Sequence, residues 1–295
     1  MIATRKDALS SSGSDHRHLL GRCIAKKVCA EEDVFVCHQM DTVLPSRLMS
    51  DIQRSPTVNS RLGSVWTVVV AGGSGRRFGS MKQFESLGDK RVLDHCVDMA
   101  LVCSAGVVLV VPSSDLQDEV DKHAVGGARS EHRVAVCAGG PTRTASVRRG
   151  LALVPGDAGI ILVHDAARPF ASENLFRSVI KTIEAGADGS IPGLPVVDTV
   201  KVIEVTHSPF VGLAVPHVVT TPDRATLVAV QTPQAFSADI LRRAYLNEID
   251  GTDDSSLVEA IGGTVIVVPG EANNRKITHR QDLLWAREFL VTGQA

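Results

Sequence analysis

The chain has 295 residues, of which 44% are apolar and 22% charged, and its formal net charge is −2. This length and apolar content suffice for one large α/β domain with a buried core. The near-neutral charge argues against a general nucleic-acid binder, and no apolar run approaches the ~18 residues of a membrane helix. The six cysteines lack disulfide-type spacing. We therefore expect reduced thiols, a cytoplasmic location, and neither a nucleic-acid nor a membrane partner.

Residues 1–62 show no sustained apolar period and include a serine- and glycine-rich run at 10–14. We expect a poorly ordered N-terminal extension here, with residues 63–295 forming the functional domain. The three cysteines of this segment include no Cys-x-x-Cys pair, so no metal site is predicted. Acidic residues at 31–33 disfavour a transit peptide, so a bacterial cytoplasm is favoured over a plastid.

From residue 64 onward, apolar runs of strand length alternate with amphipathic stretches. The predicted strands are 65–71, 106–112, 133–137, 159–163, 189–195 and 264–269. The predicted helices are 91–101, 144–153, 172–185, 238–247, 255–261 and 280–292. This alternation predicts an α/β fold, Rossmann-like, in which a mostly parallel sheet carries helices on both faces. Ligands should bind at the carboxyl ends of its strands.

One segment interrupts the alternation. Residues 199–205 and 218–221 are β-rich and are separated by Pro209, Gly212 and Pro216. We expect a protruding β-hairpin arm over about 199–223. Because a two-stranded ribbon is marginal alone, it should pack on something, and another subunit is a candidate.

The strongest motif, AGGSGRRF at 71–78, directly follows the first predicted strand, and Lys82 stands just beyond it. Glycines let backbone N–H groups approach phosphate oxygens, while Arg77 and Lys82 add charges suited to a triphosphate. The loop lacks the Gly-Lys-Ser/Thr of a Walker A loop, and Phe78 stands where the Rossmann fingerprint has its third glycine. It predicts a phosphate site of another type, the alternative being a plain glycine turn beside solvated arginines.

Further motifs follow other predicted strands. GGPTRTAS at 139–146 opens a helix whose free N–H groups suit an anionic or amide-bearing ligand. In HDAARP at 164–169, Asp165 suits a sugar hydroxyl or a cation, whereas His164 is expected to be packed rather than a base. Arg168 is expected either to touch ligand or to pair with Asp165. Scattered Arg, Lys and Thr residues suit a phosphate monoester, at 198–201, 223–224, 231–234, 252–254 and 274–278.

These motifs, in this order, resemble the 2-C-methyl-D-erythritol 4-phosphate cytidylyltransferase family over about residues 65–292. The resemblance implies a nucleotidyltransferase that moves CMP from CTP to 2-C-methyl-D-erythritol 4-phosphate, releasing pyrophosphate, in the non-mevalonate pathway to isoprenoids. It implies Mg²⁺, bound mainly through the CTP phosphates, and a homodimer formed through the arm. Since few residues follow the last predicted helix, we expect no fused cyclodiphosphate synthase.

The resemblance also implies roles for residues at matching positions. The implied catalytic residues are Arg77, Lys82, Arg224 and Lys276. The implied CTP contacts are Ala71, Gly72, Gly73, Arg77, Lys82, Gly140, Ser146, Ala166 and Lys276. The implied methylerythritol phosphate contacts are Asp165, Arg168, Arg224, Thr232, Thr252 and Lys276. Pro141 departs from the family, which often has an Asp there, and Arg275 stands where an apolar residue is common.

Three other functions compete with this interpretation: a ribitol-5-phosphate cytidylyltransferase, a hexose-1-phosphate nucleotidyltransferase, and a non-catalytic nucleotide-binding protein. The first would share the CTP half of the site. The second fits the region after Asp165 poorly. Retention of Lys82 and Lys276 argues against the third. No covalent enzyme intermediate is expected, because a phosphate monoester is itself the attacking group.

Overall fold

The computed structural model describes residues 63–73, 78–124, 133–208, 210, 212–246 and 250–293. The predicted extension at 1–62 lies outside these residues, and so does Arg77.

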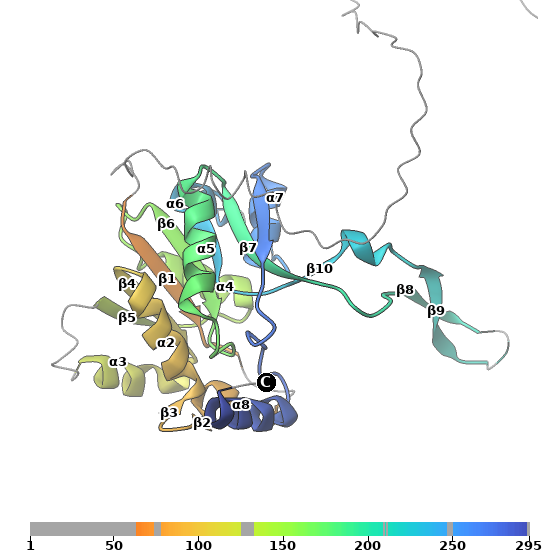
Figure 1. The fold of residues 1–295 in the computed structure, drawn as a ribbon, viewed down its shortest axis with the longest axis horizontal. Coiled ribbons are helices and arrows are strands. Elements are labelled where there is room, and N and C mark those ends of the chain that lie inside the picture. Colours follow the sequence, from red (N-terminus) through yellow and green to blue (C-terminus); the bar gives the residue numbers. More distant parts are fainter. Residues whose placement is uncertain are drawn as a thin grey trace, which may run out of the picture. The chain divides into compact units, whose positions relative to one another are not determined.

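An eight-stranded sheet forms the centre of the domain (Figure 1), in the order β10-β7-β11-β6-β1-β4-β5, with β12 also paired to β7. Its strands are β1 (Val65–Val70), β4 (Gly106–Val111), β5 (Arg133–Ala138), β6 (Ile160–Asp165), β7 (Gly189–Pro195), β10 (Val228–Val230), β11 (Gln234–Ser237) and β12 (Val265–Pro269). β1, β4, β5 and β6 pair in parallel, as does β12 with β7, whereas β10 and β11 are antiparallel. The predicted mostly parallel sheet is confirmed.

Helices cover both faces of the sheet, as predicted. α2 (Val92–Cys103) and α5 (Glu173–Glu184) share one apolar core with the strands. α4 (Arg143–Leu151), α6 (Ala238–Ala244) and α7 (Asp254–Ala260) share the other. α8 (Arg280–Thr292) packs with Phe78 and Ile277 in a third, smaller cluster. No helix in the described ranges is both long and apolar enough to span a bilayer.

Several short elements were not predicted. α3 (Leu116–Ala124), β10 and β11 are short, and two-residue strands β2 (Ser86–Leu87) and β3 (Lys90–Arg91) form a separate ribbon. α6 ends at Ala244, three residues before the predicted end. Short elements depend on their neighbours more than on their own sequence pattern.

The predicted arm is a hairpin of β8 (Val202–His207) and β9 (Ala214–Thr220), which projects away from the central sheet (Figure 1). Pro216, expected in the turn, instead lies within β9 opposite Val205. Proline is tolerated there because each strand of a two-stranded ribbon has a free edge. All of β8 is exposed, and Phe210 at the turn is 94% exposed.

Candidate active site

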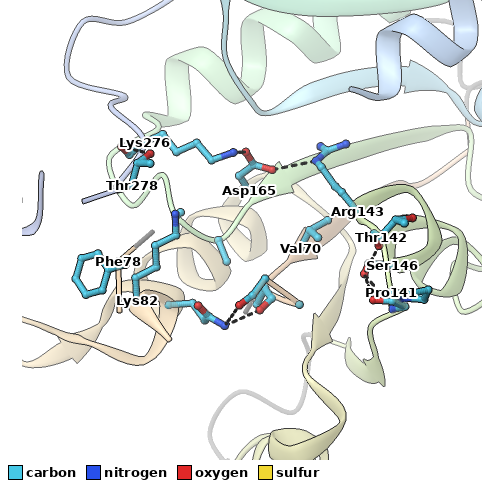
Figure 2. A pocket seen from close by; sticks show the side chains of 17 residues that line it. Val70, Phe78, Lys82, Pro141, Thr142, Arg143, Ser146, Asp165, Lys276 and Thr278 are labelled. Carbon is cyan, nitrogen blue, oxygen red and sulfur yellow. Dashed lines mark hydrogen bonds and ion pairs between the residues drawn. The ribbon is translucent and has the colours of Figure 1, made fainter. Parts of the chain in front are cut away.

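A cavity of about 610 Å³ lies at the carboxyl ends of β1 and β6 (Figure 2), where the fold predicts ligand binding. Its walls come from residues 70–73 after β1, Phe78, Lys82 and Gln83 beyond the glycine loop, 140–143 and 146 at the start of α4, 165–167 after β6, and Lys276 and Thr278. This volume is typical of sites for small ligands.

The cavity brings together most of the predicted CTP residues. Those that line it are Ala71, Gly72, Gly73, Lys82, Gly140, Ser146, Ala166 and Lys276, together with the predicted sugar-phosphate contact Asp165. Of the predicted residues that the structure describes, those that do not line the cavity are Arg168, Arg224, Thr232 and Thr252.

Gln83 fixes the backbone that leads into the glycine loop. Its buried Nε2 donates to the carbonyl oxygens of Ala71 at 2.8 Å and Gly73 at 3.2 Å. The N–H of Ala71 donates to the Val110 carbonyl at 2.7 Å, extending the β1–β4 ladder by one residue. The sequence motif contained Gln83 only as a neighbour of Lys82. Its role depends on a bend of the chain that local patterns do not show.

The turn before α4 is held by hydroxyl groups. Thr142 caps the helix by accepting from the N–H of Ala145 at 3.1 Å. Ser146 Oγ accepts from the N–H of Gly140 at 3.0 Å and donates to the Thr142 carbonyl at 2.9 Å. A Cβ at Gly140 would lie 2.5 Å from that of Ala145, so this close turn requires glycine. The predicted helix N-terminus at the ligand site is therefore present.

Two lysines enter the cavity from different parts of the chain. Lys82, in the short 3-10 helix Lys82–Phe84, donates through Nζ to the carbonyl oxygen of Ile277. Lys276 Nζ lies 2.6 Å from Asp165 Oδ2. The N–H of Ile277 donates to the Ala167 carbonyl at 2.8 Å, which fastens the segment carrying Lys276 to the end of β6. The side chains of both lysines are therefore held near the carboxyl end of β6.

Asp165 sits between two cations. Figure 2 shows Lys276 and Arg143 approaching it from opposite sides. Arg143 Nε lies 3.4 Å from Oδ1 of Asp165, and Arg143 Nη2 lies 2.7 Å from Oδ2 of Asp254. Burial alone would raise the pKa of Asp165, but the charges of Lys276 and Arg143 outweigh it and hold that pKa well below its usual range. The carboxylate is therefore ionised.

Arg143 is the main residue that sequence reasoning missed. It stood inside the predicted GGPTRTAS motif without a role. Burial would lower its pKa, but the carboxylates of Asp254 and Asp165 raise it further above the ordinary arginine value. Only the folded chain shows that one guanidinium contacts two acids from separate elements.

A series of buried hydrogen bonds holds the backbone of Asp165 in place. Thr232, which is 5% exposed, accepts from the N–H of Asp165 at 3.0 Å and pairs with His164 Nδ1 at 3.1 Å. His164 Nε2 faces the Arg168 carbonyl at 3.2 Å, so Nε2 carries the proton and Nδ1 accepts from the Thr232 hydroxyl. Burial lowers the pKa of His164 to about 4, leaving it neutral. The expectation of a packed histidine is confirmed.

Three predicted substrate residues have other surroundings. Arg168 donates to the carbonyl oxygens of Asn274 at 2.8 Å and Val230 at 3.4 Å, rather than forming an ion pair with Asp165. Arg224, beside the arm, donates to the Val197 carbonyl at 2.7 Å and so joins the two ends of the arm. Thr252 is exposed before α7. Their predicted contacts with substrate remain predictions.

Comparison with known proteins matches this architecture. The family model of 2-C-methyl-D-erythritol 4-phosphate cytidylyltransferase matches residues 65–292. A protein of that name from Nocardia farcinica is 42% identical over 234 residues, covering 77% of this chain and 94% of that protein. A structure of 4-diphosphocytidyl-2C-methyl-D-erythritol synthase from Anaerococcus prevotii aligns with a TM-score of 0.63 at 28% identity, covering 77% of this chain and 98% of that one.

Longer relatives match as well. A bifunctional IspD/IspF enzyme from Solidesulfovibrio magneticus is 40% identical over 233 residues, covering 75% of this chain. The chain spans only 56% of that relative's length. The matched region begins at β1 and ends in α8, so it contains every wall of the cavity. On this coverage and identity, the chain belongs to the 2-C-methyl-D-erythritol 4-phosphate cytidylyltransferase family.

Proposed function

We propose that this chain transfers CMP from CTP to 2-C-methyl-D-erythritol 4-phosphate, giving 4-diphosphocytidyl-2-C-methyl-D-erythritol and pyrophosphate. The observation that carries the proposal is the meeting of Lys82 and Lys276 at one short segment, facing a glycine loop and a helix start across a nucleotide-sized cavity. Family membership supports the choice of substrates, since a relative of 42% identity is named 2-C-methyl-D-erythritol 4-phosphate cytidylyltransferase.

The chemistry needs no enzyme nucleophile. A phosphate oxygen of the methylerythritol phosphate attacks the α-phosphorus of CTP in line. The bond between the α-phosphorus and the bridging oxygen breaks, and its electron pair leaves on pyrophosphate. The protein's task is to hold two anions close together. Unit charges 4 Å apart repel by ~4 kcal/mol at an effective dielectric constant near 20, a barrier that Lys82, Lys276 and Arg77 would reduce.

The proposed reaction uses Mg²⁺ bound to the phosphates of CTP, and this ion would neutralise part of the charge of the phosphate oxygens. Among the described residues, Asp165 is the only carboxylate lining the cavity, and two cations already contact it. Within the described ranges, no group of three or more His, Cys, Asp or Glu residues is placed to hold a metal. The residues present therefore fit an ion that the CTP phosphates bind and that the protein contacts little.

The arm supports a homodimer as part of the same proposal. Its strands expose Ile203, Val205 and Val218, an apolar surface that a single chain leaves uncovered. Arg224 lies at the base of the arm and does not line this chain's own cavity. This position supports a role for Arg224 in the site of a partner subunit. A cytoplasmic location is also proposed, because the described cysteines are free thiols.

The test is pyrophosphate release with CTP and Mg²⁺, comparing methylerythritol 4-phosphate with ribitol 5-phosphate. We expect release only with the former. Lys82→Ala and Lys276→Ala should each lower kcat by roughly 10²- to 10³-fold. Lys181→Ala, at an exposed position of α5, is the matched control and should leave kcat unchanged.

Other outcomes would change the assignment. Release only with ribitol 5-phosphate would keep the CTP site and replace the acceptor. A folded protein that binds CTP but releases no pyrophosphate with either acceptor would favour a non-catalytic nucleotide-binding role.

A further inference from the structure

Arg143 connects the cavity to a buried acid outside it. As the first residue of α4, it lines the cavity and extends between the last residue of β6, Asp165, and the first residue of α7, Asp254. Its two contacts use different nitrogens, Nε to Asp165 Oδ1 and Nη2 to Asp254 Oδ2. The guanidinium therefore joins the start of α4, the end of β6 and the start of α7 at the wall of the proposed CTP site.

Asp254 gives the arginine a rigid anchor. Its side chain is 0% exposed, and its second oxygen, Oδ1, accepts from the hydroxyl of buried Tyr245 at 2.5 Å. Both oxygens are thus used, and neither is free to move toward the cavity. A buried carboxylate paired on both oxygens is a strong fixed charge, because the surrounding low dielectric strengthens each contact.

The result is a line of alternating charges, Lys276, Asp165, Arg143 and Asp254. Lys276 holds Oδ2 of Asp165, and Arg143 holds Oδ1. Arg143 and Lys276 each attract one oxygen of Asp165, so Arg143 balances part of the negative charge of Asp165 that Lys276 would otherwise have to balance alone. Without Arg143, the whole carboxylate would turn to Lys276 and neutralise the lysine that a phosphate needs.

We propose that Arg143, anchored by Asp254, is a positioning residue for the transfer: it restrains Asp165 so that Lys276 stays available to the substrate phosphates. This inference rests on the proposed function. Arg143 affects the chemical step by restraining Asp165, and Asp254 affects it by anchoring Arg143.

The variants must not leave a buried charge alone. Arg143→Gln by itself would strand the Asp254 carboxylate, and such a variant is prone to unfold. The decisive protein is therefore the double variant R143Q/D254N, in which the amide oxygen introduced at position 254 still accepts from the Tyr245 hydroxyl. Arg177→Gln, an exposed arginine of α5 paired with Glu173 of the same helix, is the matched control.

We expect the double variant to fold, with kcat lower by about 30- to 100-fold and the KM for CTP changed by less than about threefold, since misplacement of a reacting group acts on the chemical step. Arg143→Lys, which keeps the charge but not the two-ended contact, should be intermediate. Arg177→Gln should match the wild type. A double variant with wild-type kcat, or one whose loss is confined to the KM for CTP, would overturn the proposal.

A second readout does not depend on turnover. The groups facing Asp165 are Lys276, Arg143, Arg168 and the neutral His164. Loss of Arg143 should therefore move the ionisation of Asp165 to higher pH, measured by carboxyl ¹³C NMR of aspartate-labelled protein. An unmoved titration overturns the restraint of Asp165 even if kcat falls. If the wild type releases no pyrophosphate, the proposed function fails, and this titration still decides whether Arg143 restrains Asp165.

Discussion

Replacement of Thr232 by valine separates two roles for this residue. The resemblance to the family implies a contact with methylerythritol phosphate, whereas the structure places the hydroxyl between the N–H of Asp165 and Nδ1 of His164. Valine has nearly the same shape and removes only the hydrogen-bonding group. The substitution leaves a buried donor and a buried acceptor unpaired, because Nε2 of His164 is already directed at the Arg168 carbonyl.

The size of the effect follows from those two groups. Each buried polar group left without a partner costs about 1–3 kcal/mol. The methyl group that replaces the hydroxyl returns roughly 1 kcal/mol of apolar burial. The free energy of unfolding should therefore fall by about 1–5 kcal/mol, a large share of the ~5–15 kcal/mol of a typical domain. Thr232→Ser keeps the hydroxyl and should lose only about 1 kcal/mol, for its missing methyl.

Urea unfolding at pH 7.5 measures both variants against the wild type, and equal m-values would show that the comparison is valid. Pyrophosphate release is measured on the same samples. A Thr232→Val variant within about 0.5 kcal/mol of the wild type, but with a raised KM for methylerythritol phosphate, would refute the supporting role and favour substrate contact.

Three further predictions concern packing, pH and assembly. Gly150→Ala should lower Tm by several degrees, because the added Cβ would lie 2.7 Å from a methyl carbon of Val68. Gly156→Ala is the control and should leave Tm unchanged, because nothing lies within 4 Å of the added Cβ. Equal Tm values for the two variants would contradict the packing argument. Burial lowers the pKa of His164 from 6.5 to about 4, so the unfolded chain binds the extra proton first. The free energy of unfolding should then fall by about 3 kcal/mol from pH 7 to pH 4, and a His164→Gln variant with the same slope would show that another group is responsible. Val205→Glu, on the exposed face of the arm, should convert a dimer to a monomer in light-scattering measurements, while Val205→Thr should not; a dimer in both would exclude this face as the contact.

The elements that sequence predicted best are those with a long, uniform pattern. The range predicted for α8 agrees with the structure at both ends, and the range predicted for β4 ends one residue late. β4 is a continuous apolar run and α8 is a thirteen-residue amphipathic helix, and both patterns can be read in the sequence alone. β11 is different: its four residues form a strand because they fill the space between β6 and β7 in antiparallel register. No local pattern shows that space.

The same distinction applies to the site: sequence predicted which residues lie near it, but not where their side chains turn. Lys82 and Asp165 were predicted at one site because they follow the glycine loop and the fourth predicted strand, and strand ends converge at one edge of a parallel sheet, whereas Lys276 was added by its residue type and by the resemblance to the family. A motif does not show which way a polar side chain turns there. Asp254 belonged to a predicted phosphate-binding group, yet it is fully buried and pairs with Arg143, 111 residues earlier in the chain. A buried acid is stable only with such a partner, so the charge of Asp254 required Arg143 to lie at this point beside the cavity. That requirement explains why an arginine lines the cavity at this point.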